Sequence, residues 1–504
     1  MTDEGVIEYR LPDEAATARL GADLAAVLVP GDLVALQGEV GAGKSTLARA
    51  MLRALHRDPT LDVPSPTFTL AVDYPNGRLP ALHVDLYRIA SPAEADELGI
   101  DEALECGVVL VEWPEKGDIA ASITVSLSET DGGESRVAWI EAVPAARARI
   151  ERSLAIRAFL ARAGHGDATR DPMAGDASAR GYETIETSAG TLLLMDSPAM
   201  PDGPPVRGTL PYSRVAHLAE NVRPFVAVAT ALRSNGLHAP AIVAADFDAG
   251  LLLTEHLGCG SILHADGRPN RERYLAVAEA LATIHDRRWP AEFPLEGAPP
   301  HRVPEFDRGA MTIEVELTLD WAFPRLVGRR ADEGERAEFH SAWDEAFDGL
   351  RGVETSLVLR DVQAPNIVWQ HGREGLDRVG LIDFQDALVG PAAYDVASLA
   401  QDARVTIPPD LEAELKSHYS SARAAVDPRF ERAYAIMAAQ RATKVFGLWV
   451  RLDERDGKPQ YLCHAPRTRA YLGRVLHDPA LAAVRAWFEK HDLLARSERL
   501  ERAA

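Results

Sequence analysis

The stretch Gly38–Thr46 reads GEVGAGKST and contains the pattern G-x-x-x-x-G-K-[ST]. The apolar run DLVALQ at 32–37 precedes it, and KSTLARAMLRAL at 44–55 repeats apolar residues at helical spacing. Strand, loop and helix in this order form a phosphate-binding loop, in which backbone N–H groups turn toward the phosphates. The sequence therefore predicts an α/β P-loop NTPase domain at the start of the chain.

The residues of this loop and two later acids predict how a nucleotide is held. Lys44 is expected to reach the β- and γ-phosphate oxygens, and the Ser45 hydroxyl to ligate Mg²⁺. The metal also needs an acid at the end of a buried strand, and Glu112 closes the apolar run VVLVEW. Asp85 in HVDLYR is a second acid, suited to orienting water or the metal. The predicted nucleotide-binding residues are Gly38, Gly41, Ala42, Gly43, Lys44, Ser45 and Thr46.

A second phosphotransfer motif lies in the C-terminal half of the chain. The stretch LRDVQAPNIVW at 359–369 is followed by VGLIDF at 379–384. In kinases the order is a catalytic Asp, then an Asn that holds metal, then a metal-binding Asp on a following strand. Asp361, Asn366 and Asp383 reproduce this order, which predicts Asp361 as the base and the other two as Mg²⁺ ligands.

Composition and charge restrict the class of protein. A chain of 504 residues with 46% hydrophobic and 26% charged residues is typical of a globular protein of two to four folding units. The formal net charge of −22 opposes contact with a nucleic-acid backbone, which proteins bind mainly through Lys and Arg. No direct DNA binding is expected, and any role on RNA is predicted to act through a partner.

Neither a membrane segment nor a disulfide framework is expected. Cys106, Cys259 and Cys463 lie far apart without a C-x-x-C pair, which is typical of a reducing compartment. The acidic N-terminal stretch lacks the features of a signal peptide, and no run of 18 apolar residues occurs. The sequence favours a cytoplasmic protein without membrane contact.

The order of apolar and polar stretches predicts two domains. A hairpin, ITVSL and RVAWIEA around SETDGGES, closes the first α/β unit near Val143. A charged helix follows, and then the polar stretch HGDATRDPMAGDASARG at 165–181. We therefore expect one domain at 1–148 and another at 149–504. Strands followed by many helices in the second domain indicate a small β-rich lobe before a larger helical lobe.

Five stretches in order carry a resemblance for the first domain: GEVGAGKST at 38–46, SPTFTL at 65–70, HVDLYRI at 83–89, ELGIDE at 97–102 and VLVEWPEKG at 109–117. Together they resemble the TsaE family, the small bacterial ATPase needed to form threonylcarbamoyladenosine in tRNA. The resemblance implies phosphate binding by Lys44, Mg²⁺ binding by Ser45 and Glu112, and Asp85 as the catalytic acid. It also places Thr67 in a switch-like loop. Glu39 departs from the family's usual Asp, which leaves the phosphate cradle intact.

The TsaE family acts on a partner and does not transfer the threonylcarbamoyl group itself. Its partner is a separate transferase complex, usually called TsaB–TsaD. The resemblance therefore implies this partner, with ATP and Mg²⁺ as cofactors. It agrees with the charge of the chain, because the tRNA would be held by the partner proteins.

The run DFQDALVGPAAYDVASLAQDARV at 383–405 resembles the aminoglycoside phosphotransferase superfamily, in which a Tyr-Asp or Phe-Asp pair follows the metal aspartate. MAGDASARGY at 173–182, QRATKVFGLWVRL at 440–452 and RDGKPQYLCHAPR at 455–467 resemble, more narrowly, its AmgK family of anomeric sugar kinases. Members phosphorylate N-acetylmuramate and N-acetylglucosamine in peptidoglycan recycling. The resemblance implies a two-lobed α+β protein-kinase-like fold and an amino-sugar substrate.

By the same comparison, AGDASAR at 174–180 covers the nucleotide phosphates, with Ser178 and Arg180 as contacts.

The second domain departs from the usual kinase pattern at two positions. Leu359 occupies the position of the histidine in H-R-D or H-G-D, and the strand TLLLMDS at 191–197 carries no lysine. Arg180 is expected to supply the missing positive charge.

The sequence thus predicts a bifunctional fusion of a tRNA-modification ATPase and an ATP-dependent sugar kinase. Two alternatives for the second domain remain open. In the first alternative, the second domain is a kinase for an aminoglycoside or choline-like substrate. In the second, it is an inactive binding module that regulates the ATPase. The presence of Asp361, Asn366 and Asp383 together argues against the inactive module.

Overall fold

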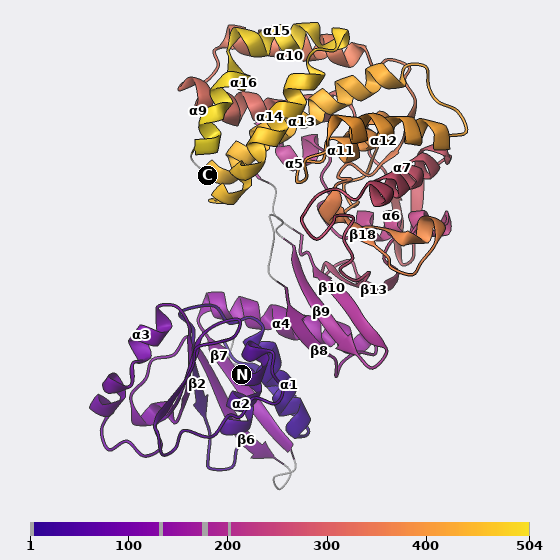
Figure 1. Ribbon diagram of the computed structural model, residues 1–504. Coiled ribbons are helices and arrows are strands. Elements are labelled where there is room, and N and C mark those ends of the chain that lie inside the picture. Colours follow the sequence, from indigo (N-terminus) through magenta and orange to yellow (C-terminus); the bar gives the residue numbers. More distant parts are fainter. Residues whose placement is uncertain (1–4, 131–134, 174–179, 200–202, 503–504) are drawn as a thin grey trace. The chain divides into compact units, whose positions relative to one another are not determined.

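The chain folds into two compact units, Met1–Asp196 and Ser197–Ala504 (Figure 1). The structure, a computed structural model, describes residues 5–130, 135–173, 180–199 and 203–502. Among these residues, no helix combines the length and the apolar character required to cross a membrane.

A seven-stranded sheet forms the centre of the first unit, with the strand order β1-β7-β6-β2-β5-β4-β3. In that order the strands are Ile7–Leu11, Ser135–Ala142, Ile123–Thr130, Leu33–Gln37, Val108–Glu112, Ala81–Asp85 and Ala71–Tyr74. The central strand β2 pairs in parallel with β5 and β6, and β4 pairs in parallel with β5. All five residues of β4 and of β5 are buried, as expected for parallel strands covered on both faces. The predicted α/β architecture of this part of the chain is confirmed.

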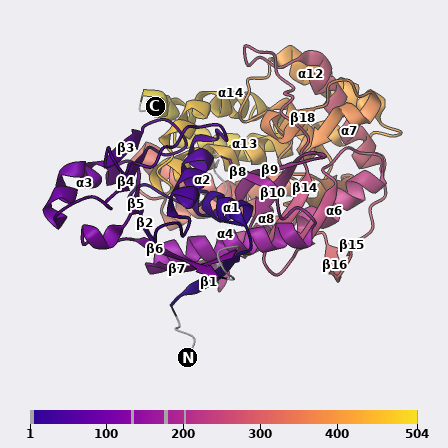
Figure 2. The same cartoon turned by 90° about the horizontal axis from the view of Figure 1, so that it is seen from below.

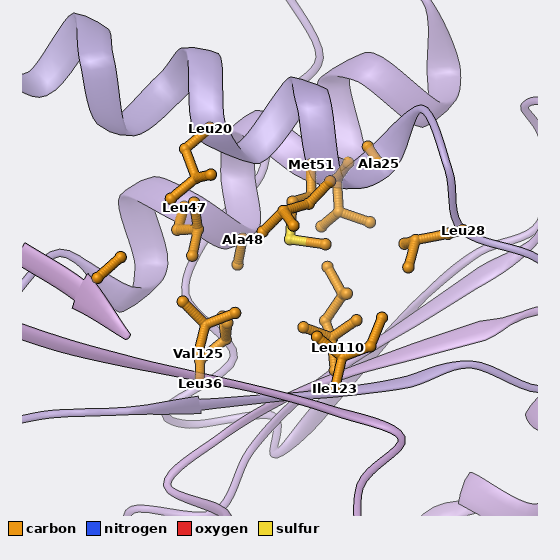
Figure 3. Close-up of a cluster of buried hydrophobic side chains, with 14 of the residues drawn as sticks. Leu20, Ala25, Leu28, Leu36, Leu47, Ala48, Met51, Leu110, Ile123 and Val125 are labelled. Atoms are coloured by element: carbon orange, nitrogen blue, oxygen red, sulfur yellow. The ribbon is translucent and has the colours of Figure 1, made fainter. Parts of the chain in front are cut away.

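The core of the first unit lies between this sheet and the helices α1 (Glu14–Ala25) and α2 (Lys44–His56). A third short helix, α3, spans Ile100–Leu104. Figure 3 shows helix side chains facing strand side chains, and its labelled members are Leu20, Ala25, Leu28, Leu36, Leu47, Ala48, Met51, Leu110, Ile123 and Val125. Close packing of α2 on the sheet fixes the loop that precedes this helix.

Beyond the seven-stranded sheet, the first unit continues through the helix α4 (Pro144–Arg162). Three further strands follow, in which each strand pairs antiparallel with the next along the chain. These strands are β8 (Thr169–Pro172), β9 (Gly181–Thr187) and β10 (Gly190–Asp196). The domain boundary predicted at 148/149 falls inside α4, whereas the two compact units divide after Asp196. The boundary at 148/149 stays a prediction.

A buried ionic network joins α1, α4, β8 and β9. Asp23 accepts hydrogen bonds from Arg157 Nε and Nη2 at 2.8 Å each and from Arg170 Nη1 at 2.9 Å. Arg170 also binds both carboxylate oxygens of Glu183, at 2.7 and 2.8 Å. The four residues are buried. Because a buried charge is tolerated only when it is paired, each member of the network requires the others.

The second unit is mainly helical. Its helices are α5 (Tyr212–Val215), α6 (Arg223–Ser234), α7 (Arg271–Asp286), α8 (Arg308–Leu317), α9 (Phe323–Val327), α10 (Glu333–Asp348), α11 (Ala393–Ala400), α12 (Pro409–Ala422), α13 (Phe430–Glu454), α14 (Ala465–Val475), α15 (Ala482–Lys490) and α16 (Leu493–Arg496). The long helix α13 packs against α8, α11 and α14, and α13 and α14 lie together in both views (Figures 1 and 2). A Cβ atom on Gly447 would lie 2.1 Å from the Leu317 carbonyl carbon, so the close contact between α13 and α8 requires glycine.

Short antiparallel strand pairs complete the second unit. They are β11 (Pro205–Arg207) with β12 (Leu210–Pro211), β13 (Ile242–Asp246) with β14 (Leu251–Glu255), β15 (Glu292–Leu295) with β16 (Ala298–Arg302), β17 (Thr355–Val358) with β20 (Leu388–Pro391), and β18 (Ile367–Trp369) with β19 (Val379–Leu381). The loop between β17 and β18 carries Asp361 and Asn366, and the loop after β19 carries Asp383. Pairing of β18 with β19 therefore brings the two ends of the predicted kinase motif to one place.

We predict that Asp23→Ala lowers the free energy of unfolding by about 3–5 kcal/mol, because it leaves two buried guanidinium groups without their shared carboxylate. Urea denaturation of the full chain measures the loss. Asp167→Ala is the matched control, since its exposed pair with Arg19 at 3.1 Å contributes at most about 1 kcal/mol. Equal effects of the two substitutions would contradict the role given to Asp23.

Candidate active sites

The P-loop site begins where β2 ends. Gly38 has a φ angle of 136°, and a Cβ atom on it would lie 2.4 Å from the carbonyl oxygen of Leu127. Only glycine fits this position, because other residues rarely adopt that backbone conformation. The loop then enters α2 at Lys44, so the first turn of the helix faces the loop as phosphate binding requires.

Lys44 is held tightly at the start of α2. Its Nζ donates hydrogen bonds to the carbonyl oxygens of Gly38 and Glu39, at 2.8 Å each, and lies 3.7 Å from the centre of the Trp113 ring. Burial lowers the pKa of Lys44, whereas Glu112, Glu115 and Asp85 act to raise it. The ammonium group thus has a fixed place over the loop, with an aromatic face on one side.

Ser45 and Glu112, the two residues predicted to hold a metal, meet directly. The Ser45 hydroxyl donates to Glu112 Oε2 at 2.8 Å, and His83 Nε2 forms a hydrogen bond with Glu112 Oε1 at 3.0 Å. His83 and Glu112 are both buried. His83 was not predicted as a site residue. Its position in HVDLYR, two residues before Asp85 on β4, is the signal that points to it.

Asp85 is oriented by three donors. Thr67 Oγ1 donates to Asp85 Oδ2 at 2.8 Å, and Ser65 Oγ donates to the same oxygen at 3.3 Å. The backbone N–H of Tyr87 donates to Asp85 Oδ1 at 2.9 Å. Thr67, expected in a switch-like loop, therefore contacts the predicted catalytic acid.

These side chains surround one cavity of about 370 Å³. Its lining is Val40, Gly41, Gly43, Lys44, Ser45, Thr46, Ser65, Thr67, Asp85, Tyr87, Glu112 and Trp113. Among the predicted loop residues, Ala42 is buried beneath the loop and Gly38 forms its first turn. A hydroxyl and one carboxylate are the ligands that Mg²⁺ takes when phosphates and water complete its shell, so the donor set fits Mg²⁺ bound with a nucleotide.

The Asp361 site lies in the second unit. Asn366 Nδ2 donates to the Asp361 carbonyl oxygen at 2.9 Å and to Asp383 Oδ2 at 3.1 Å. The structure thus brings together all three residues of the predicted motif. Asp383 has a positive φ of 60°, a conformation that costs energy for a residue other than glycine. An amide and a carboxylate side by side suit a magnesium ion carried by a nucleotide.

Asp361 is oriented by an arginine that the motif does not contain. Arg441 Nη2, from α13, lies 3.0 Å from Asp361 Oδ1. The Arg441 side chain is 7% exposed and that of Asp361 is 45% exposed. The carboxylate therefore keeps access to a substrate while one of its oxygens is fixed.

The loop before Asp361 is held by a buried carboxylate where Leu359 replaces the usual histidine. Asp395 Oδ2 accepts the N–H of Leu359 at 2.7 Å, and Asp395 Oδ1 accepts the N–H of Arg360 at 2.9 Å. Asp395 is fully buried. It is the acid of the Tyr-Asp pair in the C-terminal resemblance, and the sequence did not indicate this contact.

Glu314 of α8 anchors the same loop from the opposite side. Its Oε1 accepts from Arg360 Nη2 at 2.5 Å and lies 2.6 Å from Lys444 Nζ, and Gln440 donates to Oε2 at 2.8 Å. Burial acts to raise the pKa of Glu314, but Lys444 and Arg360 more than offset this and hold the pKa at about 2. Glu314 is therefore ionised at neutral pH despite its full burial.

Two residues, Ser178 and Arg180, are predicted to contact the kinase nucleotide. Ser178 lies outside the described residues. Arg180 is described, is half-buried and directly precedes β9. Its role as the cation that replaces a strand lysine stays a prediction.

Two family models match this chain. The TsaE model, "Threonylcarbamoyl adenosine biosynthesis protein TsaE", matches residues 11–137, and the APH model, "Phosphotransferase enzyme family", matches residues 169–434. The second match begins at β8, inside the first compact unit. These matches confirm the predicted fold classes, a P-loop α/β domain followed by a kinase-like phosphotransferase fold.

Curated relatives resemble the two parts separately. An "N-acetylmuramate/N-acetylglucosamine kinase" of Caulobacter vibrioides is 34% identical over 354 residues, which are 68% of this chain and 97% of that protein. A "tRNA threonylcarbamoyladenosine biosynthesis protein TsaE" of Nostoc sp. is 35% identical over 139 residues, 27% of this chain and 84% of that protein. A solved microcompartment-associated aminopropanol kinase covers 66% of this chain and 99% of its own, at 14% identity and a TM-score of 0.43.

We predict that Glu314 makes stability depend on acid pH. Its pKa is lowered in the folded state from 4.5 to about 2, so its contribution is complete above about pH 4.5 and is lost as the pH falls toward 2. Glu314→Gln should lower the free energy of unfolding at neutral pH by about 3–5 kcal/mol and should flatten the acid dependence.

Urea denaturation of both proteins between about pH 6 and pH 3 measures this difference. Asp320→Asn is the control, because Asp320 forms an exposed pair with Arg336 at 2.8 Å and should leave the pH profile unchanged. A Glu314→Gln profile parallel to that of the wild type would show that Glu314 does not cause the acid dependence.

Proposed function

The chain belongs to the TsaE family through its N-terminal part and to the phosphotransferase enzyme family through its C-terminal part, and on this premise we propose a bifunctional enzyme. One part hydrolyses ATP to support formation of N6-threonylcarbamoyladenosine in tRNA. The other transfers the γ-phosphate of ATP to the anomeric hydroxyl of N-acetylmuramate or N-acetylglucosamine. The observation that carries the kinase proposal is the contact of Asn366 with both Asp361 and Asp383.

In the proposed ATPase, the contacts of the P-loop site assign a role to each side chain. Lys44 leaves the carbonyl oxygens of its loop to bind the β- and γ-phosphates. Ser45 and Glu112, already hydrogen-bonded to each other, would hold Mg²⁺, which would supply positive charge to neutralise the phosphates. Asp85, fixed by Thr67 and the Tyr87 N–H, orients the attacking water.

The ATPase is proposed to act with a transferase complex of the TsaB–TsaD type, which would hold the tRNA. The support is the net charge of −22, which opposes direct contact of this chain with a nucleic-acid backbone. The free cysteines Cys106, Cys259 and Cys463 are all exposed, which suits a reducing compartment, and we propose the cytoplasm as its location.

In the proposed kinase, Asp361 accepts the proton of the anomeric hydroxyl. At the same time the hydroxyl oxygen bonds to the γ-phosphorus, and the bond between the γ-phosphorus and ADP breaks. Arg441 fixes one oxygen of Asp361, so the other faces the acceptor. Asn366 and Asp383 would hold Mg²⁺ on the nucleotide. The brace from Asp395 keeps the loop in place without the usual histidine.

We predict that Lys44→Ala abolishes ATP hydrolysis by the P-loop site and support of tRNA threonylcarbamoylation, because the charge that binds the β- and γ-phosphates is lost. Phosphorylation of N-acetylmuramate by the same variant should continue at the wild-type rate. A reconstituted modification assay with the partner complex measures the first effect. Full modification by Lys44→Ala would refute the assignment of this loop.

We predict different defects for the two acids of the Asp361 site. Asp361→Asn removes the proton acceptor, so kcat should fall by about 10²–10⁴ with little change in ATP affinity. Asp383→Asn removes a metal carboxylate, so MgATP should bind more weakly, and raised Mg²⁺ should restore part of the activity. The measurements are kcat and nucleotide affinity across a Mg²⁺ titration.

The same assay tests the substrate class. Wild-type protein is offered N-acetylmuramate, N-acetylglucosamine, an aminoglycoside and choline, and transfer of phosphate to each is measured. If only the aminoglycoside or choline were phosphorylated, the sugar-kinase proposal would be replaced by a kinase for an aminoglycoside or choline-like substrate. Full sugar phosphorylation by Asp361→Asn would exclude this residue as the base.

A further inference from the structure

His83 is a polar side chain inside a strand that is otherwise apolar up to Asp85. The strand β4 reads ALHVD, and all five of its residues are buried. The His83 side chain is 1% exposed, and it does not contribute to the lining of the P-loop cavity. A buried polar ring costs free energy unless it forms a hydrogen bond. The partner of the ring therefore indicates what the ring does.

The partner of His83 is Glu112, the acid proposed to hold Mg²⁺. The parallel pairing of β4 with β5 places Asp85 opposite Glu112, so His83, two residues before Asp85, lies on the same face of the sheet. His83 Nε2 is 3.0 Å from Glu112 Oε1, and the Ser45 hydroxyl donates to Glu112 Oε2 at 2.8 Å. Each oxygen of this buried carboxylate thus has a hydrogen-bond partner.

This contact determines which nitrogen of the ring carries the hydrogen. An ionised carboxylate only accepts hydrogen bonds, so Nε2 of His83 must be the donor. Nδ1 is buried and has no hydrogen-bond partner in the part of the chain that the structure describes. In the neutral ring with its hydrogen on Nε2, Nδ1 carries no hydrogen, so no buried N–H group is left unpaired.

The position of His83 excludes a direct role in the reaction. The side chain does not reach the cavity, so it cannot bind the nucleotide or the attacking water. Nδ1 is buried and Nε2 is occupied by Glu112, so neither nitrogen is accessible to a metal ion. Mg²⁺ also prefers oxygen ligands. The ring can therefore act only through the carboxylate of Glu112.

We propose that His83 is a positioning residue for the metal site of the ATPase. By donating to Oε1, His83 fixes the Glu112 carboxylate so that Oε2 stays beside Ser45 and available to Mg²⁺. The inference rests on the proposed ATPase function. It goes beyond that function because it assigns the orientation of a metal ligand to a residue that contacts neither the nucleotide nor the metal. Hydrogen bonds to metal ligands typically contribute about 10- to 100-fold to metal affinity.

The experiment measures binding of a fluorescent ADP analogue to the full-length chain, in EDTA and across a Mg²⁺ titration. The parent protein and every variant carry Asp383→Asn, which is predicted to weaken MgADP binding at the kinase site. The signal that remains in the Lys44→Ala version is subtracted. His83→Met is similar in size and has no donor. It should raise the Mg²⁺ concentration that gives half of the increase in binding about 10- to 100-fold.

The same measurement separates positioning from folding. In EDTA, His83→Met should bind ADP as tightly as the parent, which also shows that the variant folds. His83→Gln is the rescue variant, because its amide N–H can donate to Glu112 from nearly the position of Nε2, and it should restore most of the Mg²⁺ affinity. His56→Met is the matched control, since His56 packs edge-on against Tyr74 and does not line the cavity. It should leave the titration unchanged.

Three results would overturn the positioning role while the ATPase proposal stands. They are a parental Mg²⁺ titration in His83→Met, equal losses in His83→Met and His83→Gln, and a loss of ADP binding in EDTA as large as the loss with Mg²⁺. The last result would show that the ring only supports the fold. A parent protein that binds ADP equally with and without Mg²⁺ would instead refute the proposed metal site itself.

Discussion

The carboxylate of Asp23 determines how the first unit is built, because two buried guanidinium groups share it. Arg157 comes from α4 and Arg170 from β8, so a single acid on α1 fixes both the helix that leaves the ATPase fold and the first strand of the phosphotransferase match. Arg170 extends the network to Glu183 on β9. Such a network tolerates little movement, since any displaced member becomes an unpaired buried charge.

The limits of the compact units do not coincide with the family boundaries. The phosphotransferase match begins at residue 169, yet β8 to β10 belong to the unit of the P-loop fold. Arg57, directly after α2, adds to this attachment: its Nε lies 2.6 Å from Asp171, and its Nη2 donates to the Pro172 carbonyl at 2.7 Å. The helix that begins with Lys44 therefore ends against β8, which leads into the predicted phosphate-covering stretch at 174–180.

Site residues that lie within a contiguous motif could be predicted from the sequence. Contacts between residues far apart in the chain could not. Lys44 and Ser45 follow from a contiguous pattern in which backbone conformation does most of the binding. His83 and Asp395 also lie in short motifs, but these motifs do not reveal the contacts, because the partners lie 29 and 36 residues away. The polar composition of 165–181 also did not reveal that Arg170 and Asp171 are paired in the fold.

The departures from the kinase pattern have a common physical explanation. A catalytic loop needs its backbone fixed, but that requirement does not specify a histidine. Asp395 accepts hydrogen bonds from the backbone N–H groups of Leu359 and Arg360. Glu314 of α8 accepts a hydrogen bond from the Arg360 side chain. Both carboxylates are fully buried, so each contact is strong and each is intolerant of an uncharged replacement. Leu359 can then serve as a core residue, because the orientation of Asp361 no longer depends on the side chain two positions before it.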